Sequence, residues 1–325
     1  MADADVLIEV VDLTRRFSGC EALGGVSFQV RRGEIVGLLG PNGSGKTTLL
    51  RILASYLAPS AGRVAIAGHD VVVQSLEARG RIGYLPENVS LYLEMRVAEY
   101  LAYRGRLKGL HGERLATRIR EVLARCGLAD AARHVIGTLS RGHRQRTALA
   151  DCLLHKPEVL LLDEPLAGLD PGQTRAMQAW WRETGRDRAV VFSTHVLADA
   201  EQFCDRVLVL NAGRLAAAEA PARLQQTTAR LYAEFLAPQD DLATALQTLT
   251  GGDSCRLETR PDGWMAVSVR GAAAAGLPAR LDELAQARQW PLRNVRSESR
   301  DFAEAYLRLT APPPLVRNPS ERQAG

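Results

Sequence analysis

The residues with the clearest capacity for chemistry lie between Gly40 and Thr48. They read Gly-Pro-Asn-Gly-Ser-Gly-Lys-Thr-Thr and fit the spacing G-x-x-x-x-G-K-[ST]. The glycines allow successive backbone N–H groups to converge on one anion. Lys46 adds a positive charge for the β- and γ-phosphates of a nucleotide, and Thr47 offers a hydroxyl to Mg²⁺. We therefore predict a phosphate site formed by Gly40, Pro41, Asn42, Gly43, Ser44, Gly45, Lys46, Thr47 and Thr48.

The segments on either side of this loop have the character that a phosphate site requires. Residues 34–39 form a short apolar run typical of a strand, and residues 48–57 carry leucines at helical spacing. The helix would add the positive end of its dipole to the loop. An ordinary glycine-rich turn before a helix is the alternative, but it would require neither the full spacing nor this context.

Two further apolar strands end in residues that can do chemistry. Residues 159–162 are followed by Asp163 and Glu164, and residues 189–194 by His195. Carboxylates at the end of a buried strand are costly unless they bind something. Because ligands of doubly wound parallel sheets lie beyond the carboxyl ends of the strands, one site would hold the loop, both carboxylates and His195. The alternatives are a helix-capping role for Asp163 and a hydrogen-bonded core position for His195.

A helix start at Ser140 is crowded with positive charge. Ser140 is a suitable N-cap residue, and Arg141, Arg144 and Arg146 follow it within two turns. The helix dipole disfavours cations at this end, so the arrangement indicates an anion that docks there. Alternatively, the arginines simply point to solvent.

Length and composition restrict the classes of protein. The 325 residues have room for two domains, and no apolar run approaches the length of a membrane span. The N-terminus lacks the pattern of a signal peptide. The 5 cysteines lie far apart without a C-x-x-C pair, which predicts reduced thiols in a cytosolic protein and no structural metal. The net charge of +4 is too mild to call for nucleic acid.

The pattern of the chain divides it into an α/β nucleotide-binding domain over residues 1–224 and a smaller domain over 225–310. Residues from about 88 to 139 carry apolar side chains at helical spacing and predict a helical insert. Beyond residue 225 the expected order is β-α-β-β-α-β and then a helix, which favours a small α+β domain of ferredoxin-like type. Residues 311–325, rich in proline and polar residues, predict a disordered tail.

With these motifs in order, residues 5–224 resemble the nucleotide-binding subunit of an ABC transporter, which has a P-loop NTPase fold. Gly40 to Thr48 matches the Walker A motif and residues 159–164 match the Walker B motif. Residues 139–146 match the family signature, usually L-S-G-G-Q-x-Q-R. Residues 167–170 look like the D-loop, His195 like the switch histidine, and Phe17 like the aromatic residue under adenine.

The resemblance implies ATP and Mg²⁺ as cofactors and a second copy of the chain as partner. In this family two subunits close head to tail around two ATP molecules. Ser140, Arg141, Gly142 and His143 of one copy, with Asp170, would then complete the site of the other. Phe17 would stack on adenine, although it could also be an ordinary core aromatic.

The resemblance also assigns chemical roles. Asp163 and Thr47 would hold Mg²⁺, Glu164 would orient or deprotonate the attacking water, and His195 would bond the γ-phosphate or that water. Glu87 stands where the family usually has glutamine, so we count it as a catalytic and metal-site candidate with an added negative charge. The alternative for Glu87 is a solvated loop carboxylate. Arg141 and Leu166 also depart from the family pattern, which has glycine and threonine there.

Within the family, residues 82–88 and 91–95 are similar to ABC-2 type exporter ATPases, especially those of gliding motility. Residues 140–146 are similar to that type and to the ATPase of nitrous oxide reductase maturation. This similarity implies an ATPase at the cytoplasmic face of the cell membrane that powers a separately encoded permease, with export as the direction. No nucleic acid partner is expected. The alternative is a non-transport ABC ATPase acting on a ribosomal or nucleic-acid complex; one nucleotide-binding unit and a short helical insert fit it poorly.

Overall fold

The apolar runs predicted as strands lie at the centre of a six-stranded sheet. A computed structural model describes residues 5–166, 171–228, 230–250, 255–270, 277–298 and 302–311. The strand order is β10-β9-β3-β8-β7-β6, parallel throughout except for β10. The bounds are β3 Ile35–Leu39, β6 Ile82–Leu85, β7 Val159–Leu162, β8 Ala189–Ser193, β9 Arg206–Asn211 and β10 Arg214–Glu219.

This sheet is buried on both faces, which explains why its strands are continuously apolar. Leu161 and Val191 contribute to one core cluster, together with leucines of helix α1 (Lys46–Leu53). Leu160 and Val190 contribute to another, together with Trp181 of helix α6 (Pro171–Thr184). Successive side chains of a strand point to opposite faces, so each face needs its own apolar partner. The helices α2 (Ser75–Gly80) and α7 (Leu197–Phe203) are shorter.

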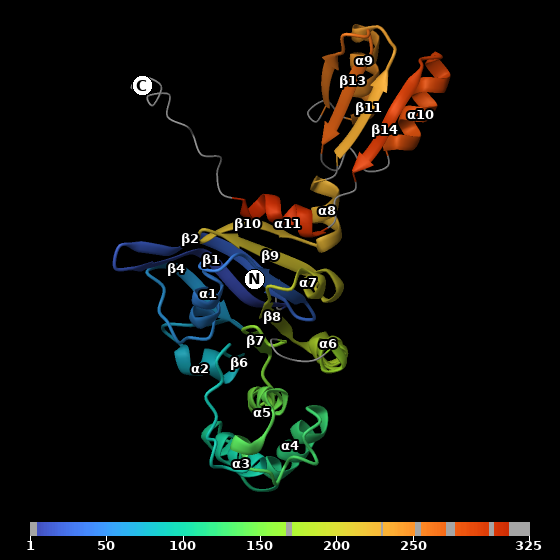
Figure 1. Cartoon of the computed structure of the whole chain (residues 1–325). Helices are drawn as coiled ribbons and strands as arrows, with labels where there is room; N and C mark the ends of the chain where they lie inside the picture. The colour runs from blue at the N-terminus through green and yellow to red at the C-terminus, as the bar shows by residue number, and fades with distance from the viewer. Residues whose placement is uncertain are drawn as a thin grey trace, which may run out of the picture.

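A second, antiparallel sheet has the order β2-β1-β4-β5 and shares a core cluster with α1. Its strands are β1 Val6–Phe17, β2 Cys20–Arg31, β4 Ala61–Ile66 and β5 His69–Asp70. At the other end of the molecule, Figure 1 shows the helices α3, α4 and α5 gathered together. They are α3 Val97–Leu107, α4 Gly112–Arg125 and α5 Arg141–Leu153, with short 3₁₀ turns at Ile136–Thr138 and Gly185–Asp187. The first two lie within the predicted helical insert.

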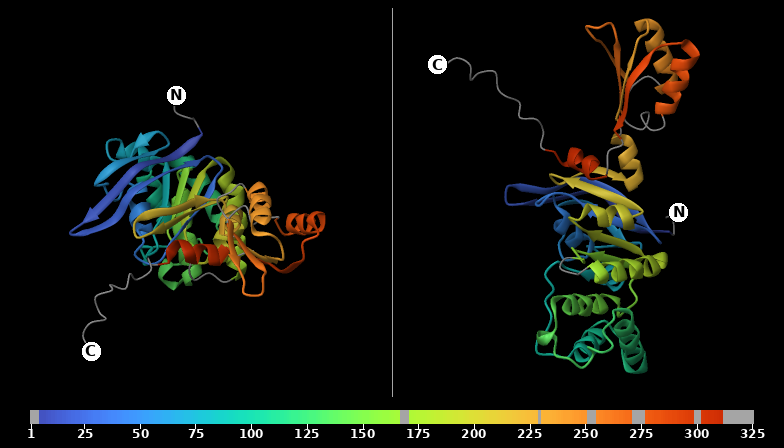
Figure 2. Two further views of the ribbon diagram at one scale, coloured as in Figure 1. Left: turned by 90° about the horizontal axis from the view of Figure 1, so that it is seen from above. Right: turned by 45° about the vertical axis from the view of Figure 1, so that its right-hand side comes forward.

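The C-terminal part contains an extra antiparallel sheet of order β12-β13-β11-β14. Figures 1 and 2 show it well separated from the central sheet, with α9 and α10 on one of its faces. Its elements are β11 Arg230–Phe235, α9 Gln239–Thr250, β12 Cys255–Thr259, β13 Met265–Arg270, α10 Leu277–Arg288 and β14 Leu292–Glu298. Leu242, Val267 and Leu281 belong to the core cluster between the helices and the sheet.

Two helices connect this extra sheet with the nucleotide-binding part. Helix α8 (Pro221–Thr228) precedes the sheet and α11 (Phe302–Thr310) follows it. Phe302 of α11 and Leu224 of α8 share a core cluster with Val209 of β9. The last helix therefore packs on the nucleotide-binding part, although it lies within the segment predicted as the second domain. The predicted tail lies, apart from Ala311, outside the described residues.

The face of the extra sheet opposite α9 and α10 carries a charged network around Glu234. Its carboxylate accepts hydrogen bonds from Arg293 (2.7 Å), Asn294 (2.9 Å) and Tyr232 (2.8 Å). The guanidinium of Arg293 also lies over the ring of Trp264. These bonds, that from Arg293 first, hold the pKa of Glu234 at about 2, below its ordinary value of 4.5.

This network predicts acid sensitivity of the extra sheet. A depressed pKa in the folded state contributes stability above the unfolded pKa, and that stability is lost as the pH falls from about 4.5 towards 2. Scanning calorimetry should show that the melting temperature of the extra sheet falls as the pH is lowered across this range. In Glu234→Gln this melting temperature should be lower than in the wild type at neutral pH, and it should depend less on pH. Glu258→Gln, which changes an exposed carboxylate on β12, is the matched control. The same dependence of the melting temperature on pH in the wild type and in both variants would contradict the role of Glu234.

Candidate functional site

The predicted phosphate loop connects the central strand β3 with α1. Gly45 occupies the position before the helix with φ of 105°, a left-handed conformation that favours glycine. The Nζ of Lys46 donates hydrogen bonds to the carbonyls of Gly40 (2.7 Å) and Pro41 (3.1 Å), so the lysine lies back across its own loop. Burial lowers the pKa of Lys46, while the nearby carboxylates Glu164, Asp163 and Glu87 act in the opposite direction. The cation thus lies near Glu164, Asp163 and Glu87.

A cavity of about 560 Å³ opens beside this loop. It brings together the phosphate loop and four other chain segments: the ends of β7 and β8, the loop after β6, and β2. The lining residues are Ala22, Asn42, Gly43, Ser44, Gly45, Lys46, Thr47, Thr48, Glu87, Asp163, Glu164 and His195. The sequence thus predicted every lining residue except Ala22. Gly40 and Pro41 belong to the same loop but do not line the cavity.

The two acidic residues are joined by Ser193, which the sequence analysis did not single out, and His195 contacts one of them. Ser193, the last residue of β8, donates from its Oγ to Asp163 Oδ1 at 2.6 Å and accepts the backbone N–H of Glu164 at 2.8 Å. His195 Nδ1 lies 2.8 Å from Glu164 Oε2. A hydroxyl both donates and accepts, so Ser193 can orient both acidic residues at once. Its position two residues before His195 was the only available signal.

Glu164 has a backbone conformation that residues with a side chain seldom adopt. Its φ is 48°, in the left-handed region. The bond from its N–H to Ser193 and the contact of its carboxylate with His195 hold it there. Strained backbone of this kind is retained where the surroundings enforce it, and such residues cluster at active sites. The conformation therefore agrees with a chemical role for Glu164.

The residues around Asp163 fit a bound Mg²⁺. Asp163 is 2% exposed, and its Oδ2 is buried without a hydrogen-bond partner among the described residues. Mg²⁺ takes oxygen ligands and is usually held by one or two protein groups together with phosphate oxygens and water. No cluster of three histidine, cysteine or acidic side chains that could hold a metal by itself occurs in the described part of the chain. Asp163 and the nearby Thr47 could hold the ion if a nucleotide supplied the remaining ligands.

The predicted signature residues lie at the start of α5 and do not line this cavity. Ser140 accepts the backbone N–H of His143 at 3.3 Å, which confirms it as the N-cap. Arg141 is exposed, whereas Gly142 is buried. The guanidinium of Arg146 donates to the carbonyls of Gly127 (2.9 Å) and Cys126 (3.4 Å), just after α4. Arg146 is therefore neither a solvent-directed side chain nor a free anion ligand, because it satisfies carbonyls at a helix end.

The remaining predicted residues are placed as follows. Phe17 ends β1, is 43% exposed and does not line the cavity. The guanidinium of Arg15 lies 4.5 Å from the centre of its ring and covers one face. Leu166, a departure from the family pattern, packs against the core cluster that contains Trp181. Asp170 lies outside the described residues.

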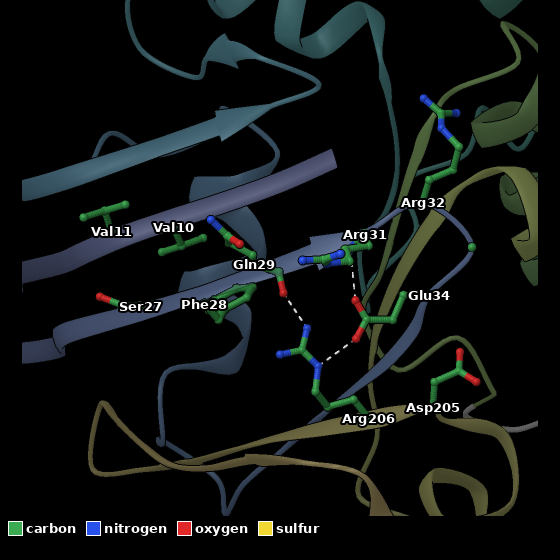
Figure 3. A pocket seen from close by; sticks show the side chains of 11 residues that line it. Val10, Val11, Ser27, Phe28, Gln29, Arg31, Arg32, Glu34, Asp205 and Arg206 are labelled. Atoms are coloured by element: carbon green, nitrogen blue, oxygen red, sulfur yellow. Dashed lines mark hydrogen bonds and ion pairs between the residues drawn. The ribbon is translucent and has the colours of Figure 1, made fainter. Parts of the chain in front are cut away.

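A larger cavity of about 740 Å³ lies at the opposite ends of the central strands (Figure 3). It is lined by β1, β2 and the start of β9, and it carries no serine–carboxylate–histidine network of the kind described above. Arg206 is bonded to Glu34 at 2.7 Å, and Asp205 accepts the N–H of Ile35 at 2.8 Å. Because these charges are neutralised within the protein, the smaller cavity at the phosphate loop is the better candidate site.

Comparisons with known proteins agree with this site. The profile of the ABC transporter family matches residues 23–167. The chain is 42% identical over 209 residues to the uncharacterised ABC transporter ATP-binding protein YxlF of Bacillus subtilis, covering 64% of this chain and 69% of that one. It is 39% identical over 252 residues to the daunorubicin resistance ATP-binding protein DrrA3 of Streptomyces coeruleorubidus, covering 76% and 80%.

Among solved structures, the chain is similar to the dimeric ATP-binding cassette MJ0796 bound to ADP and Pi. The TM-score is 0.59 at 26% identity, with 66% of this chain and 98% of that chain covered. The chain therefore belongs to the ATP-binding subunits of ABC transporters. It is an ATPase whose hydrolysis of ATP is coupled to transport.

The position of Ser193 predicts a measurable effect on hydrolysis. Ser193→Ala would leave Asp163 Oδ1 and the N–H of Glu164 without their common partner, and we expect ATP hydrolysis to slow by about 10- to 100-fold. Steady-state phosphate release measures the rate, and thermal unfolding tests for a general loss of stability. Thr194→Ala is the matched control, because among the described residues its hydroxyl accepts the N–H of Val196 and contacts neither acidic residue. A Ser193→Ala rate equal to that of the wild type would show that the serine does not orient the site.

Proposed function

We propose that this chain powers a separately encoded ABC-2 type permease and that the direction of transport is export. The observation that carries the proposal is the cavity in which the phosphate loop, Asp163, Glu164 and His195 meet. A drug-resistance protein among the relatives supports export. None of the described helices is long and apolar enough to cross a membrane. The subunit would act at the cytoplasmic face of the cell membrane through its permease.

In the proposed reaction, Glu164 orients or deprotonates the water that attacks the γ-phosphate. Its carboxylate and the ring of His195 already lie in hydrogen-bond contact, so the histidine can fix the direction of the carboxylate. Asp163, Thr47 and Glu87 would hold Mg²⁺, which would supply positive charge beside the phosphates. Lys46 would exchange its bonds to the loop carbonyls for phosphate oxygens. Hydrolysis then depends on positioning and charge, which the cavity supplies.

The proposed active form is a head-to-tail dimer of two copies. ABC ATPases form dimers, as in the similar cassette bound to ADP and Pi. Ser140, Arg141, Gly142 and His143 contribute nothing to the cavity of their own chain, although they form the start of α5, where the first backbone N–H groups have no carbonyl partner within the helix. In the dimer they would face the phosphates in the partner copy, together with Asp170. Phe17 would stack on adenine through the ring face that Arg15 leaves open.

A groove of about 610 Å³ between the central sheet and the helical insert is the proposed permease contact. Three large apolar side chains that line it, Tyr56, Leu76 and Leu107, are each more than 60% exposed. Arg79, Arg104, Lys108 and Arg114 lie on the same lining. Exposed apolar side chains gathered in a groove mark an interaction site. The segment after Glu87 also carries an exposed aromatic residue, Tyr92, whose ring packs against Tyr103 of α3.

We also propose a fold for the C-terminal part. The strand order β12-β13-β11-β14 with both helices on one face supports a ferredoxin-like domain over residues 225–310. The nucleotide-binding domain would comprise residues 1–224. Within the ABC-2 type, we propose that the chain is most similar to the ATPases of gliding motility and of nitrous oxide reductase maturation.

Glu164→Gln tests the proposed base. The amide keeps the size of the side chain but cannot take a proton, so hydrolysis should slow by about 10²- to 10⁴-fold while ATP still binds. Because uncleaved ATP holds the two copies together, size-exclusion chromatography with ATP should show a dimer. A variant that hydrolyses ATP at the wild-type rate would remove Glu164 from the mechanism.

Leu107→Glu tests the proposed permease contact. A charge at this exposed position of the groove should abolish co-purification of a membrane protein from detergent extracts. The ATPase rate of the isolated subunit should not change, since Leu107 lies outside the nucleotide cavity. Leu236→Glu is the control, an equally drastic change at an exposed position after β11. Retention of the membrane partner by Leu107→Glu would exclude the groove, and co-purification of ribosomes or DNA would favour a non-transport function.

A further inference from the structure

The phosphate loop rests on the end of β9 and on the turn that follows it. A Cβ atom on Gly40 would lie 2.4 Å from the carbonyl oxygen of Leu210, so the two backbones are in close contact. The N–H of Gly213 donates to the carbonyl of Ser44 at 3.1 Å. The carbonyl of Gly213 in turn accepts the N–H of Gly24 on β2 at 2.9 Å. The turn is therefore wedged between β2 and the phosphate loop.

This turn has little freedom to change its shape. Ala212 and Gly213 have φ values of 46° and 76°, as in the tight hairpin turns that join two antiparallel strands. A Cβ on Gly213 would lie 2.8 Å from the backbone oxygen of Ala22, which leaves no room for a side chain. Ala22 itself lines the nucleotide cavity. A displacement of the turn would consequently reach both β2 and the loop.

Asn211, the residue before this turn, connects it with the last helix of the described chain. Its Nδ2 donates to the carbonyl of Leu309 at 3.0 Å. The last carbonyls of a helix have no partner within the helix, so Asn211 satisfies one of them at the end of α11. Phe302 and Ala305 anchor α11 in a cluster that includes Leu39, the residue directly before Gly40. The helix thus packs on β9 and shares a core cluster with the end of β3, the two strands that support the phosphate loop.

We propose that Asn211 is a positioning residue for the nucleotide site. Its bond to Leu309 holds the β9–β10 turn against α11. Because Gly213 of this turn donates to the carbonyl of Ser44, the position of the turn affects that of the phosphate loop. The inference rests on the binding of ATP at this loop. Because the extra sheet lies in the chain between α8 and α11, a movement of this sheet would also reach the nucleotide site through α11.

Two variants of the full-length chain test the proposal. Asn211→Ala removes the side-chain donor, and Asn211→Asp keeps the shape but presents a carboxylate that cannot donate to a carbonyl. Both should weaken ATP binding by about 3- to 10-fold, the factor expected from the loss of one hydrogen bond. The value of kcat at saturating ATP should stay close to that of the wild type, since Asn211 touches neither Glu164 nor His195. Calorimetric titration gives the affinity, and phosphate release separates KM from kcat.

Hydrogen exchange and two variants of α11 provide the controls. The peptide that covers residues 38–50 should exchange faster in both Asn211 variants than in the wild type. Phe302→Ala, which loosens the helix anchor, should reproduce the weaker ATP binding. Leu307→Ala changes a side chain that is 62% exposed on the same helix and should leave affinity unchanged.

The possible outcomes are distinct. Wild-type affinity and wild-type exchange in both Asn211 variants would overturn the proposal, even if Phe302→Ala fails to fold. A fall in kcat with unchanged affinity would also overturn it, because the loop would then still bind normally. Failure of the wild type to bind ATP would instead contradict the nucleotide site itself.

Discussion

The parallel, in-register pairing of β3, β8 and β7 is the constraint on which the site depends. Leu38 pairs with Ser193, and Phe192 pairs with Leu162, so the three strands end at the same edge of the sheet. Neighbouring strands lie about 4.8 Å apart, which places the phosphate loop roughly 10 Å from the carboxylates two strands away. That span is suited to a triphosphate with its metal ion. A shift of register by one residue would turn Ser193 away from Asp163 and separate the two acidic residues from their common hydrogen-bond partner.

The charge at this edge indicates that a nucleotide bound there would need a cation beside it. Lys46 lies within reach of three carboxylates, which oppose the effect of its burial, and it is bonded to carbonyls of its own loop. Phosphate groups would add more negative charge beside Asp163, Glu164 and Glu87, and like charges in a partly buried site repel strongly. Mg²⁺ and the loop N–H groups are the available compensation. Glu87, exposed at the rim, alters this balance in a way that a neutral glutamine would not.

Away from the cavity, polar side chains also satisfy backbone groups at the ends of helices. Arg146 bonds the carbonyls after α4, and Asn211 bonds a carbonyl at the end of α11. The first contact joins α5 to the end of α4 in the helical insert. The second joins β9 to the C-terminal helix, and the proposed role of Asn211 at the nucleotide site depends on it.

The sequence by itself determined the chemistry of the phosphate loop and the carboxylates. The spacing from Gly40 to Thr48 depends on local backbone geometry, and the apolar runs before Asp163 and His195 reflect burial on both faces of a sheet. Both signals are confined to a few neighbouring residues, so they can be recognised without the fold. The N-cap role of Ser140 was predictable for the same reason.

Only the tertiary structure decided the contacts between distant segments. Ser193 bridges 30 positions to Asp163, Arg146 reaches back 19 positions to Gly127, and Asn211 bonds a carbonyl 98 positions further along. The last helix was predictable as a helix, but its packing on β9 depends on which apolar face remains uncovered after the sheet has formed. A serine, an arginine and an asparagine carry no local pattern that reveals such a partner. Their roles arise from the close approach of backbones in the folded chain, which the sequence records only residue by residue.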